Sequence, residues 1–288
     1  MSFRFGTSNA CFTKAYGIKE GLTVIKNCGF DCVTLDLSDA IESGVLFDKT
    51  KTESYFAELK KFLDEIGLVA YQTQLPPLPY NEQDLSTAAS IAKNAVLATA
   101  VLGGMYAIIE PIVFEDEENT YRESFAANMQ LFSEIRELGK ENGVCIAVPN
   151  TVGYSDIKRT GMPNAYSSAG KLNALLDGLG DGFVACLDTA RAYYAGQYPA
   201  HTAELLGERL KVVRLADCDG KGADKLPLTA GQIVWKDVAA SLAKVGFTGV
   251  INFDTDYLRS GKSVAPYLGK VTVGIGKDLA AMIQENNP

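Results

Sequence analysis

Residues 144–150, Val-Cys-Ile-Ala-Val-Pro-Asn, form a short apolar run that stops at a proline and an asparagine. Later stretches share this pattern of a short apolar segment with a polar residue at or near its end: residues 183–187 before Asp188, residues 210–215 with Arg214, and residues 250–253 before Asp254. Strands buried on both faces of a parallel sheet have such sequences, and in a closed α/β barrel their C-terminal ends converge. The pattern therefore predicts functional residues at the strand ends.

Eight segments of this kind alternate with helical segments along the chain. The predicted strands are residues 4–7, 32–37, 69–73, 106–109, 144–148, 183–187, 210–215 and 249–253. Eight strand and helix units within 288 residues favour a single (β/α)8 TIM-barrel domain over residues 1–288. An open doubly wound sheet is the alternative, but such sheets usually have fewer strands, and no Gly-x-Gly-x-x-Gly follows the first strand.

Composition and charge exclude several classes of protein. With 47% hydrophobic and 22% charged residues, the chain can bury a large core. The formal net charge of -8 repels a phosphate backbone, so no nucleic-acid partner is expected. No run of 18 apolar residues appears and residues 1–8 do not resemble a signal peptide, so we expect no membrane partner and a cytoplasmic location. A small molecule is the expected partner, and homo-oligomerisation is left open.

Short motifs along nearly the whole chain, from Gly29-Phe30-Asp31-Cys32-Val33 to Phe253-Asp254, resemble the xylose-isomerase-like TIM barrels. These are sugar-phosphate isomerases and epimerases, so the resemblance implies a small carbohydrate at the C-terminal mouth of the barrel. In that family a divalent metal is held at the ends of strands five to eight. Its ligands are a Glu in a Glu-Asn pair, an Asp in an Asp-Thr-Gly-His phrase, a His and a Glu.

On this chain the metal-binding phrases of the family are altered. They fall on Pro149-Asn150, Asp188-Thr189-Ala190-Arg191, Arg214-Leu215-Ala216-Asp217 and Asp254. Arginine cannot be a metal ligand, because its guanidinium group has only hydrogen-bond donors. We therefore expect no tight metal site and no cofactor. The alternative is Mg²⁺ or Mn²⁺ held weakly, through waters, at Asp188 and Asp254.

The strand ends and the resemblance together give a set of candidate site residues. The candidate catalytic residues are Asp254, Asp188 and Glu110, and the candidate substrate-binding residues are Asp36, Gln74, Asn150, Arg191, Arg214 and Asp217. The single histidine, His201, has no ligand-like spacing and is expected at the surface. Arg191 and Arg214 either pair with internal carboxylates or bind an anionic ligand; in the second case a sugar acid or phosphate binds better than the neutral sugar.

Two functions are compatible with these residues. The first is an isomerase or epimerase, catalysing aldose-ketose isomerisation or ketose epimerisation without the usual metal, with a carboxylate as base and an arginine as electrophile. The second is a non-catalytic protein that binds a sugar or a sugar acid on the same barrel. Loss of both proton-transferring glutamates favours binding or altered chemistry, whereas the retained carboxylates favour an enzyme. The fold cannot choose between them, because this barrel hosts many reactions.

Overall fold

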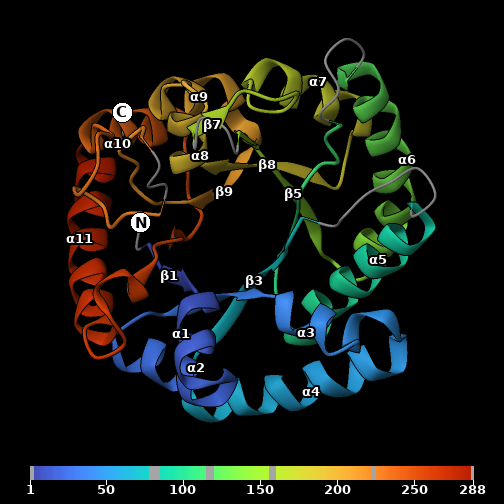
Figure 1. Ribbon diagram of the computed structural model, residues 1–288, viewed down its shortest axis with the longest axis horizontal. Coiled ribbons are helices and arrows are strands. Elements are labelled where there is room, and N and C mark those ends of the chain that lie inside the picture. Colours follow the sequence, from blue (N-terminus) through green and yellow to red (C-terminus); the bar gives the residue numbers. More distant parts are fainter. Residues whose placement is uncertain (1–2, 78–84, 115–119, 156–159, 222–224, 287–288) are drawn as a thin grey trace.

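The computed structural model describes residues 3–77, 85–114, 120–155, 160–221 and 225–286, and shows a barrel of parallel strands inside a ring of helices (Figure 1). The eight strands are β1 (Phe5–Ser8), β2 (Cys32–Asp36), β3 (Val69–Leu75), β4 (Tyr106–Ile109), β5 (Cys145–Pro149), β8 (Phe183–Asp188), β9 (Leu210–Arg214) and β10 (Ile251–Phe253). They follow one another around the barrel in sequence order, and a parallel bridge between Leu215 and Phe253 joins the last two strands. The predicted (β/α)8 barrel is confirmed.

Helices surround the strands and bury their apolar faces against them. They are α1 (Ala10–Tyr16), α2 (Ile18–Asn27), α3 (Ser38–Glu42), α4 (Lys49–Ile66), α5 (Leu85–Leu102), α6 (Thr120–Glu141), α7 (Ala169–Leu179), α8 (Thr189–Tyr194), α9 (Pro199–Leu206), α10 (Trp235–Lys244) and α11 (Ala265–Glu285). In α4 the apolar residues Phe56, Leu59 and Leu63 recur at helical spacing and are buried, and Gly67 ends the helix in the left-handed conformation. Helical periodicity therefore sets the outer layer of the barrel.

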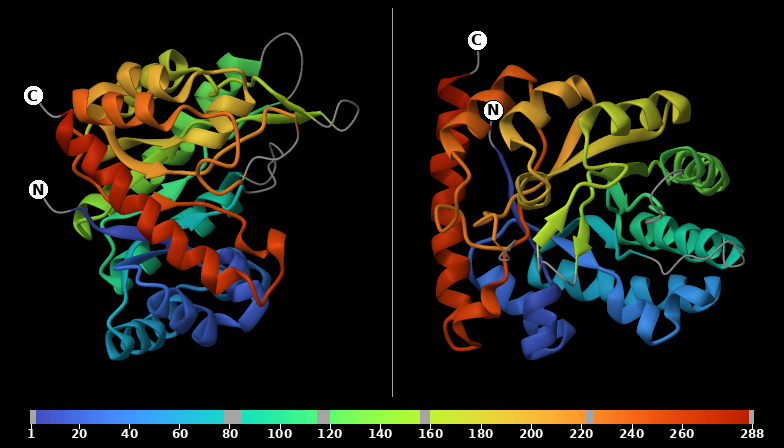
Figure 2. Two further views of the ribbon diagram at one scale, coloured as in Figure 1. Left: turned by 90° about the vertical axis from the view of Figure 1, so that its left-hand side faces the viewer. Right: turned by 45° about the horizontal axis from the view of Figure 1, so that its top comes forward.

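Some element boundaries differ from those expected from the sequence. Strand β3 continues to Leu75, two residues beyond the predicted end, and β5 includes Pro149 as its last residue. A proline is admitted at that position because the pairing of β5 with β4 ends at Ala147, while the bond to β8 is made by the Asn150 backbone N, which donates to the Cys186 carbonyl at 3.3 Å. The expected loop at residues 151–164 contains an antiparallel hairpin, β6 (Gly153–Ser155) and β7 (Thr160–Met162), which projects from the barrel (Figure 2). Residues 156–159 of that loop lie outside the described residues.

Helix α5 is the one helix among the described residues that is long and apolar enough to cross a membrane. The sequence contains no uninterrupted apolar run there, because Ser90, Lys93 and Thr99 break it. In the barrel 56% of this helix is buried, and it packs against α4 and α6 (Figure 1). Its apolar character is thus accounted for by its place in the barrel wall.

The side chains inside the barrel position the strand-end residues. Apolar residues from four adjacent strands form a small buried cluster: Ile108, Ala147, Cys186 and Val212. Side chains alternate along a strand, so the next inward-facing positions lie two residues further on. These positions are Glu110, Pro149, Asp188 and Arg214. On the remaining strands Asp36, Gln74 and Asp254 follow the hydrogen-bonded interior residues Thr34, Gln72 and Asn252 in the same way.

Two helical glycines provide a test of the packing around the barrel. A methyl group at Gly21 in α2 would lie 2.8 Å from the carbonyl carbon of Phe12 in α1, whereas one at Gly274 in α11 would have no neighbour within 4 Å. We expect Gly21→Ala to lower the free energy of unfolding by about 1–3 kcal/mol through overpacking. Gly274→Ala should raise it by up to ~1 kcal/mol, because alanine is the better helix former. Urea denaturation measures both; equal effects would show that α1 and α2 pack less closely than described.

Candidate functional site

Arg214 lies at the centre of a group of charged side chains at the C-terminal ends of the strands. It is the last residue of β9, is 1% exposed, and pairs in register with Asp188 at the end of β8. Its Nη1 lies 3.2 Å from Asp188 Oδ2 and 3.8 Å from Glu110 Oε1. Its Nη2 donates to Asp254 Oδ2 at 2.5 Å. One guanidinium therefore joins carboxylates from the ends of β4, β8 and β10.

Arg191 and Lys225 complete this group. The Asp188 carboxylate caps helix α8 by accepting from the Arg191 backbone N at 2.9 Å, which brings the Arg191 side chain back over the barrel. Arg191 Nη1 donates to Glu110 Oε1 at 2.7 Å, and Lys225 Nζ lies 3.2 Å from Asp254 Oδ2. The six side chains, called the mouth cluster below, carry formal charges that cancel: Arg191, Arg214 and Lys225 against Glu110, Asp188 and Asp254.

Ion pairing keeps Asp254 and Arg214 of the mouth cluster charged at neutral pH. Burial raises the pKa of the Asp254 carboxyl, but the charges of Arg214 and Lys225 outweigh burial and hold this pKa well below its usual value. Burial lowers the pKa of the Arg214 guanidinium, but Asp254, Asp188 and Glu110 together raise it above its usual value. Asp254 is consequently a very weak base, and both arginines are occupied by internal carboxylates.

Asn150 and Asp217, both predicted to bind substrate, are fully buried and hold backbone groups in place. Asn150 Oδ1 accepts from the Asp188 backbone N at 2.7 Å, and Asn150 Nδ2 donates to the Asp188 carbonyl at 3.1 Å. The Asp217 carboxylate accepts from three donors in the segment that follows it: the backbone N atoms of Cys218 and Ile233 at 2.8 and 3.0 Å, and Trp235 Nε1 at 3.0 Å. Both side chains thus fix the shape of the barrel mouth.

Asp36 and Gln74 lie side by side at the ends of β2 and β3, where they are in register. Asp36 Oδ1 accepts from the Ser38 backbone N at 2.9 Å, and Gln74 is buried. Within the described part of the chain, neither side chain forms an ion pair or hydrogen bond with the mouth cluster. His201 is exposed on α9, and among the described residues it belongs to no group of three or more His, Cys, Asp or Glu side chains that could hold a metal ion.

Lys225 is the member of the mouth cluster that sequence reasoning missed. It lies in the polar segment between β9 and α10, next to Leu226, whose backbone forms two hydrogen bonds with Asp217, at 2.8 and 3.0 Å. The Lys225 carbonyl also accepts from the Asp256 backbone N at 2.8 Å, and together these bonds hold Lys225 beside Asp254, 29 residues further along the chain. A lysine in a polar, glycine-rich loop is ordinarily solvated, so no pattern in the sequence distinguishes it.

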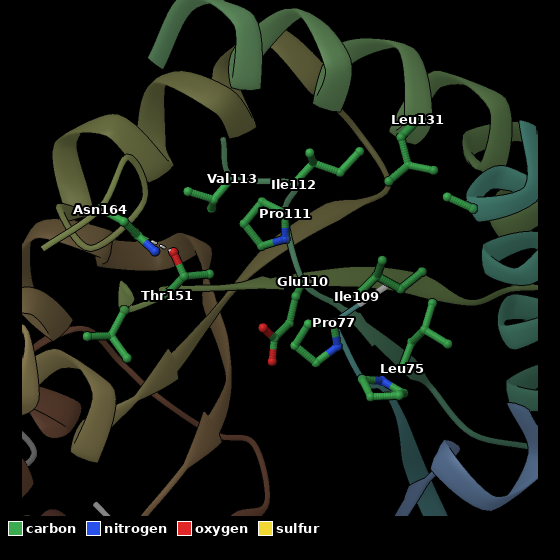
Figure 3. Close-up of a pocket in the computed structure, with 13 residues that line it drawn as sticks. Leu75, Pro77, Ile109, Glu110, Pro111, Ile112, Val113, Leu131, Thr151 and Asn164 are labelled. Carbon is green, nitrogen blue, oxygen red and sulfur yellow. Dashed lines mark hydrogen bonds between the residues drawn. The ribbon is translucent and has the colours of Figure 1, made fainter. Parts of the chain in front are cut away.

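A cavity of about 240 Å³ adjoins the mouth cluster (Figure 3). It lies between the ends of β3, β4 and β5 and the helices α5 and α6, which contribute Ala88 and Leu131. Most of its wall is aliphatic, and Glu110 belongs both to the wall and to the mouth cluster. We call this space the side cavity. It places aliphatic side chains, together with Thr151 and Asn164, next to the charged group at the barrel mouth.

The chain is similar to a family of TIM barrels and to solved structures of sugar epimerases and isomerases. The family model described as xylose isomerase-like TIM barrel matches residues 22–267. The chain is similar to D-allulose 3-epimerase from Methylomonas sp. in complex with D-allulose, with 17% identity, coverage of 96% of this chain and 99% of that one, and a TM-score of 0.72. It is also similar to D-psicose 3-epimerase from Clostridium cellulolyticum with D-tagatose, with 11% identity, coverage of 96% and 99%, and a TM-score of 0.75.

A sugar phosphate isomerase/epimerase from Parabacteroides distasonis is a further similar structure, with 14% identity, coverage of 100% of this chain and 96% of that one, and a TM-score of 0.68. No curated protein matches the sequence. At these identities the solved structures show a shared fold, while the family match covers most of the chain. The resemblance inferred from short motifs is therefore confirmed.

Removal of the central cation should destabilise the barrel. In Arg214→Met the buried carboxylates lose their counter-charge, so the free energy of unfolding at pH 7 should fall by about 3–5 kcal/mol. The loss should shrink at pH 5, because the unpaired carboxyls then have raised pKa values and take up protons. In the wild type the pKa of Asp254 is lowered by folding, so Asp254 stabilises the folded state at every pH above the pKa of an unfolded Asp, about 3.9. The contribution of Asp254 to the free energy of unfolding therefore changes little between pH 5 and 7.

The matched control is Arg209→Met, which removes an exposed ion pair with Asp177. This variant should lose less than about 1 kcal/mol at either pH. Urea denaturation at pH 5 and 7 gives all the values. Equal losses for the two variants, or a loss at Arg214 that does not depend on pH, would contradict the central role of Arg214.

Proposed function

This chain belongs to the xylose isomerase-like TIM-barrel family, and from that premise we propose that it binds a small neutral carbohydrate at the C-terminal mouth of its barrel without a divalent metal. The observation that carries the proposal is the place of the Arg214 guanidinium, between the carboxylates of Asp188 and Asp254. The chain supplies its own buried cation where the resemblance locates a metal ion.

The residues at the metal positions do not fit a divalent cation. Pro149 offers no side-chain ligand, and Arg214 offers only N–H donors. In the part of the chain that the structure covers, no three His, Cys, Asp or Glu side chains are grouped so that they could hold a metal ion. The Asp188 and Asp254 oxygens already lie 3.2 and 2.5 Å from Arg214, so a cation bound there would share them with a buried positive charge. This disfavours the alternative of weakly bound Mg²⁺ or Mn²⁺.

The charge balance of the mouth cluster favours a neutral ligand over an anionic one. Both arginines are paired with internal carboxylates, so neither has a free charge for a carboxylate or phosphate. Sugar hydroxyls both donate and accept hydrogen bonds, which suits a surface where carboxylate oxygens and N–H donors alternate. Lys225, whose side chain is 41% exposed, and the partly buried Arg191 are the cations that a ligand can reach.

A second candidate function is a metal-independent isomerase or epimerase, and one observation favours it. Glu110 lines the side cavity; its Oε1 accepts from Arg191, but its Oε2 accepts no hydrogen bond from any described residue. Among the candidate bases Asp254 is disfavoured, because a carboxylate with a strongly lowered pKa removes a proton from carbon poorly. Glu110 would then be the base and Arg191 the group that polarises the sugar carbonyl.

The purified protein should contain no stoichiometric Mn²⁺, Zn²⁺ or Co²⁺. Elemental analysis after dialysis against each metal chloride and gel filtration measures this directly. Treatment with EDTA should leave the Tm unchanged, because Arg214 already neutralises the two aspartates. One metal ion per chain, with a fall in Tm on its removal, would contradict the metal-independent proposal.

Binding should not depend on a negative charge of the sugar. Calorimetric titration should give neutral ketoses and D-galactose affinities equal to or above that of D-galacturonic acid. Arg191→Met should weaken binding roughly tenfold or more, since a charge-assisted hydrogen bond contributes ~1.5–3 kcal/mol. The control Arg209→Met should leave the affinity unchanged.

The same samples distinguish the two candidate functions. Proton NMR of the bound ketose in deuterated water should show no exchange of the hydrogens on C1 and C3, the two carbons next to the carbonyl, if the protein only binds the sugar. Exchange that Glu110→Gln abolishes would instead establish the isomerase or epimerase. A clearly higher affinity for the uronic acid than for the neutral sugar would show instead that the arginines bind an anionic ligand.

A further inference from the structure

We propose that the side cavity is a second subsite, which takes an uncharged apolar group of about the size of a phenyl ring, attached to the sugar that occupies the mouth cluster. The inference rests on the proposed sugar-binding function and narrows its ligand to a sugar with an apolar substituent. Four features of the cavity lead to it: its proline wall, the hydrogen bonds that fix one wall segment to α6, the hydrogen bond between Thr151 and Asn164, and its junction with Glu110.

Prolines give the side cavity a wall without backbone donors. Pro76 and Pro77 follow β3, and Pro111 follows Glu110 at the end of β4. A proline has no N–H and its φ angle is locked, so these segments offer ring carbons to the cavity and keep their shape when it is filled. A preformed apolar wall of this kind is typical of ligand sites rather than of loosely packed surface.

Three backbone polar groups of the wall segment after Pro111 are hydrogen-bonded to side chains of α6. Asn128 in α6 accepts from the Ile112 backbone N and donates to the Ile112 carbonyl, both at 2.8 Å. The Phe114 backbone N donates to Ser124 Oγ at 3.0 Å. Asn128 and Ser124 are fully buried. The segment is therefore fixed to α6, and it presents the side chains of Ile112 and Val113 to the cavity.

The polar side chains on the wall, apart from Glu110, bind each other. Thr151 Oγ1 donates to Asn164 Oδ1 at 2.7 Å, the hydrogen bond drawn in Figure 3. Asn164 Oδ1 also accepts from the Tyr166 backbone N and from Ser167 Oγ, both at 3.1 Å. This oxygen needs no partner from a ligand. The aliphatic side chains of the wall, such as Leu75, Ile112 and Val113, are therefore the part of the cavity that an apolar group would contact.

Glu110 joins the side cavity to the mouth cluster. In Figure 3 its carboxylate lies at the edge of the cavity beside Pro77, apart from Ile112 and Leu131. Its Oε2 can accept a hydrogen bond from a sugar hydroxyl at the boundary, while its negative charge excludes an anionic group from the cavity. A cavity of about 150 Å³ accommodates benzene, so about 240 Å³ accommodates a phenyl ring with a small linker.

The test compares methyl and phenyl glycosides of the same sugar, for D-glucose, D-galactose and D-xylose, by calorimetric titration. Wild type should bind the phenyl glycoside of the accepted sugar at least about tenfold more tightly than the methyl glycoside, a difference of ~1.4 kcal/mol. Val113→Phe fills the cavity and should abolish this preference while leaving the affinity for the methyl glycoside unchanged. Benzyl alcohol serves as a probe of the cavity alone; it should bind wild type and not Val113→Phe.

Val24→Phe is the matched control. Val24 is also half-buried, but it lies on α2 and does not line the cavity, so this variant should keep the phenyl preference. An unchanged affinity for the methyl glycoside shows that Val113→Phe is folded.

The outcomes separate the subsite from the proposed function. Equal affinities for methyl and phenyl glycosides overturn the subsite and leave sugar binding intact. A phenyl preference that survives in Val113→Phe, or no binding of benzyl alcohol to wild type, also overturns the subsite. Binding of benzyl alcohol that Val113→Phe blocks, with no glycoside bound, supports the apolar site and overturns the sugar function.

Discussion

The barrel mouth depends on one buried guanidinium. Taking Arg214 out of water costs several kcal/mol unless carboxylates surround it, and the same cost applies to each carboxylate taken alone. Asp188, Asp254 and Glu110 come from three different strands, so their ion pairs with Arg214 require that β4, β8, β9 and β10 end at one level. The constraint is mutual, because none of these groups is tolerable there without the others.

The ion pairs of the mouth cluster also bear on the class of ligand in the proposed function. Because the cations and anions of the mouth cluster cancel, the site has no net charge to attract an ion, and its alternating donors and acceptors suit hydroxyl groups. The side cavity adds an apolar compartment that shares Glu110 with the cluster. The ligand proposed above, with a polyhydroxylated part and an apolar part, has one part for each of these two regions.

Local sequence patterns predicted the frame of the site, because they report burial and alternation. Side chains alternate along a strand, so the residue two positions beyond an inward-facing residue also faces inward. By this rule the polar residues at the strand ends, Glu110, Asp188, Arg214 and Asp254, were identified as members of the cluster. The same patterns could not reveal Lys225, which is held beside Asp254 by backbone hydrogen bonds of Leu226 with Asp217 and of its own carbonyl with the Asp256 backbone N. Nor could they show that Asn150 and Asp217 bind backbone groups.

The sequence by itself determined the closed barrel, the family and the inward-facing residues, since each follows from periodicity and short motifs within one segment. Whether Arg191 and Arg214 face a ligand or internal carboxylates was decided only by the tertiary structure. The reason is that ion pairing depends on distances between strands 26 to 104 positions apart in sequence, such as Glu110 to Arg214 and Asp188 to Arg214, which no local pattern encodes. The side cavity was likewise decided only by the tertiary structure, since residues of β3, β4, β5, α5 and α6 together form its wall.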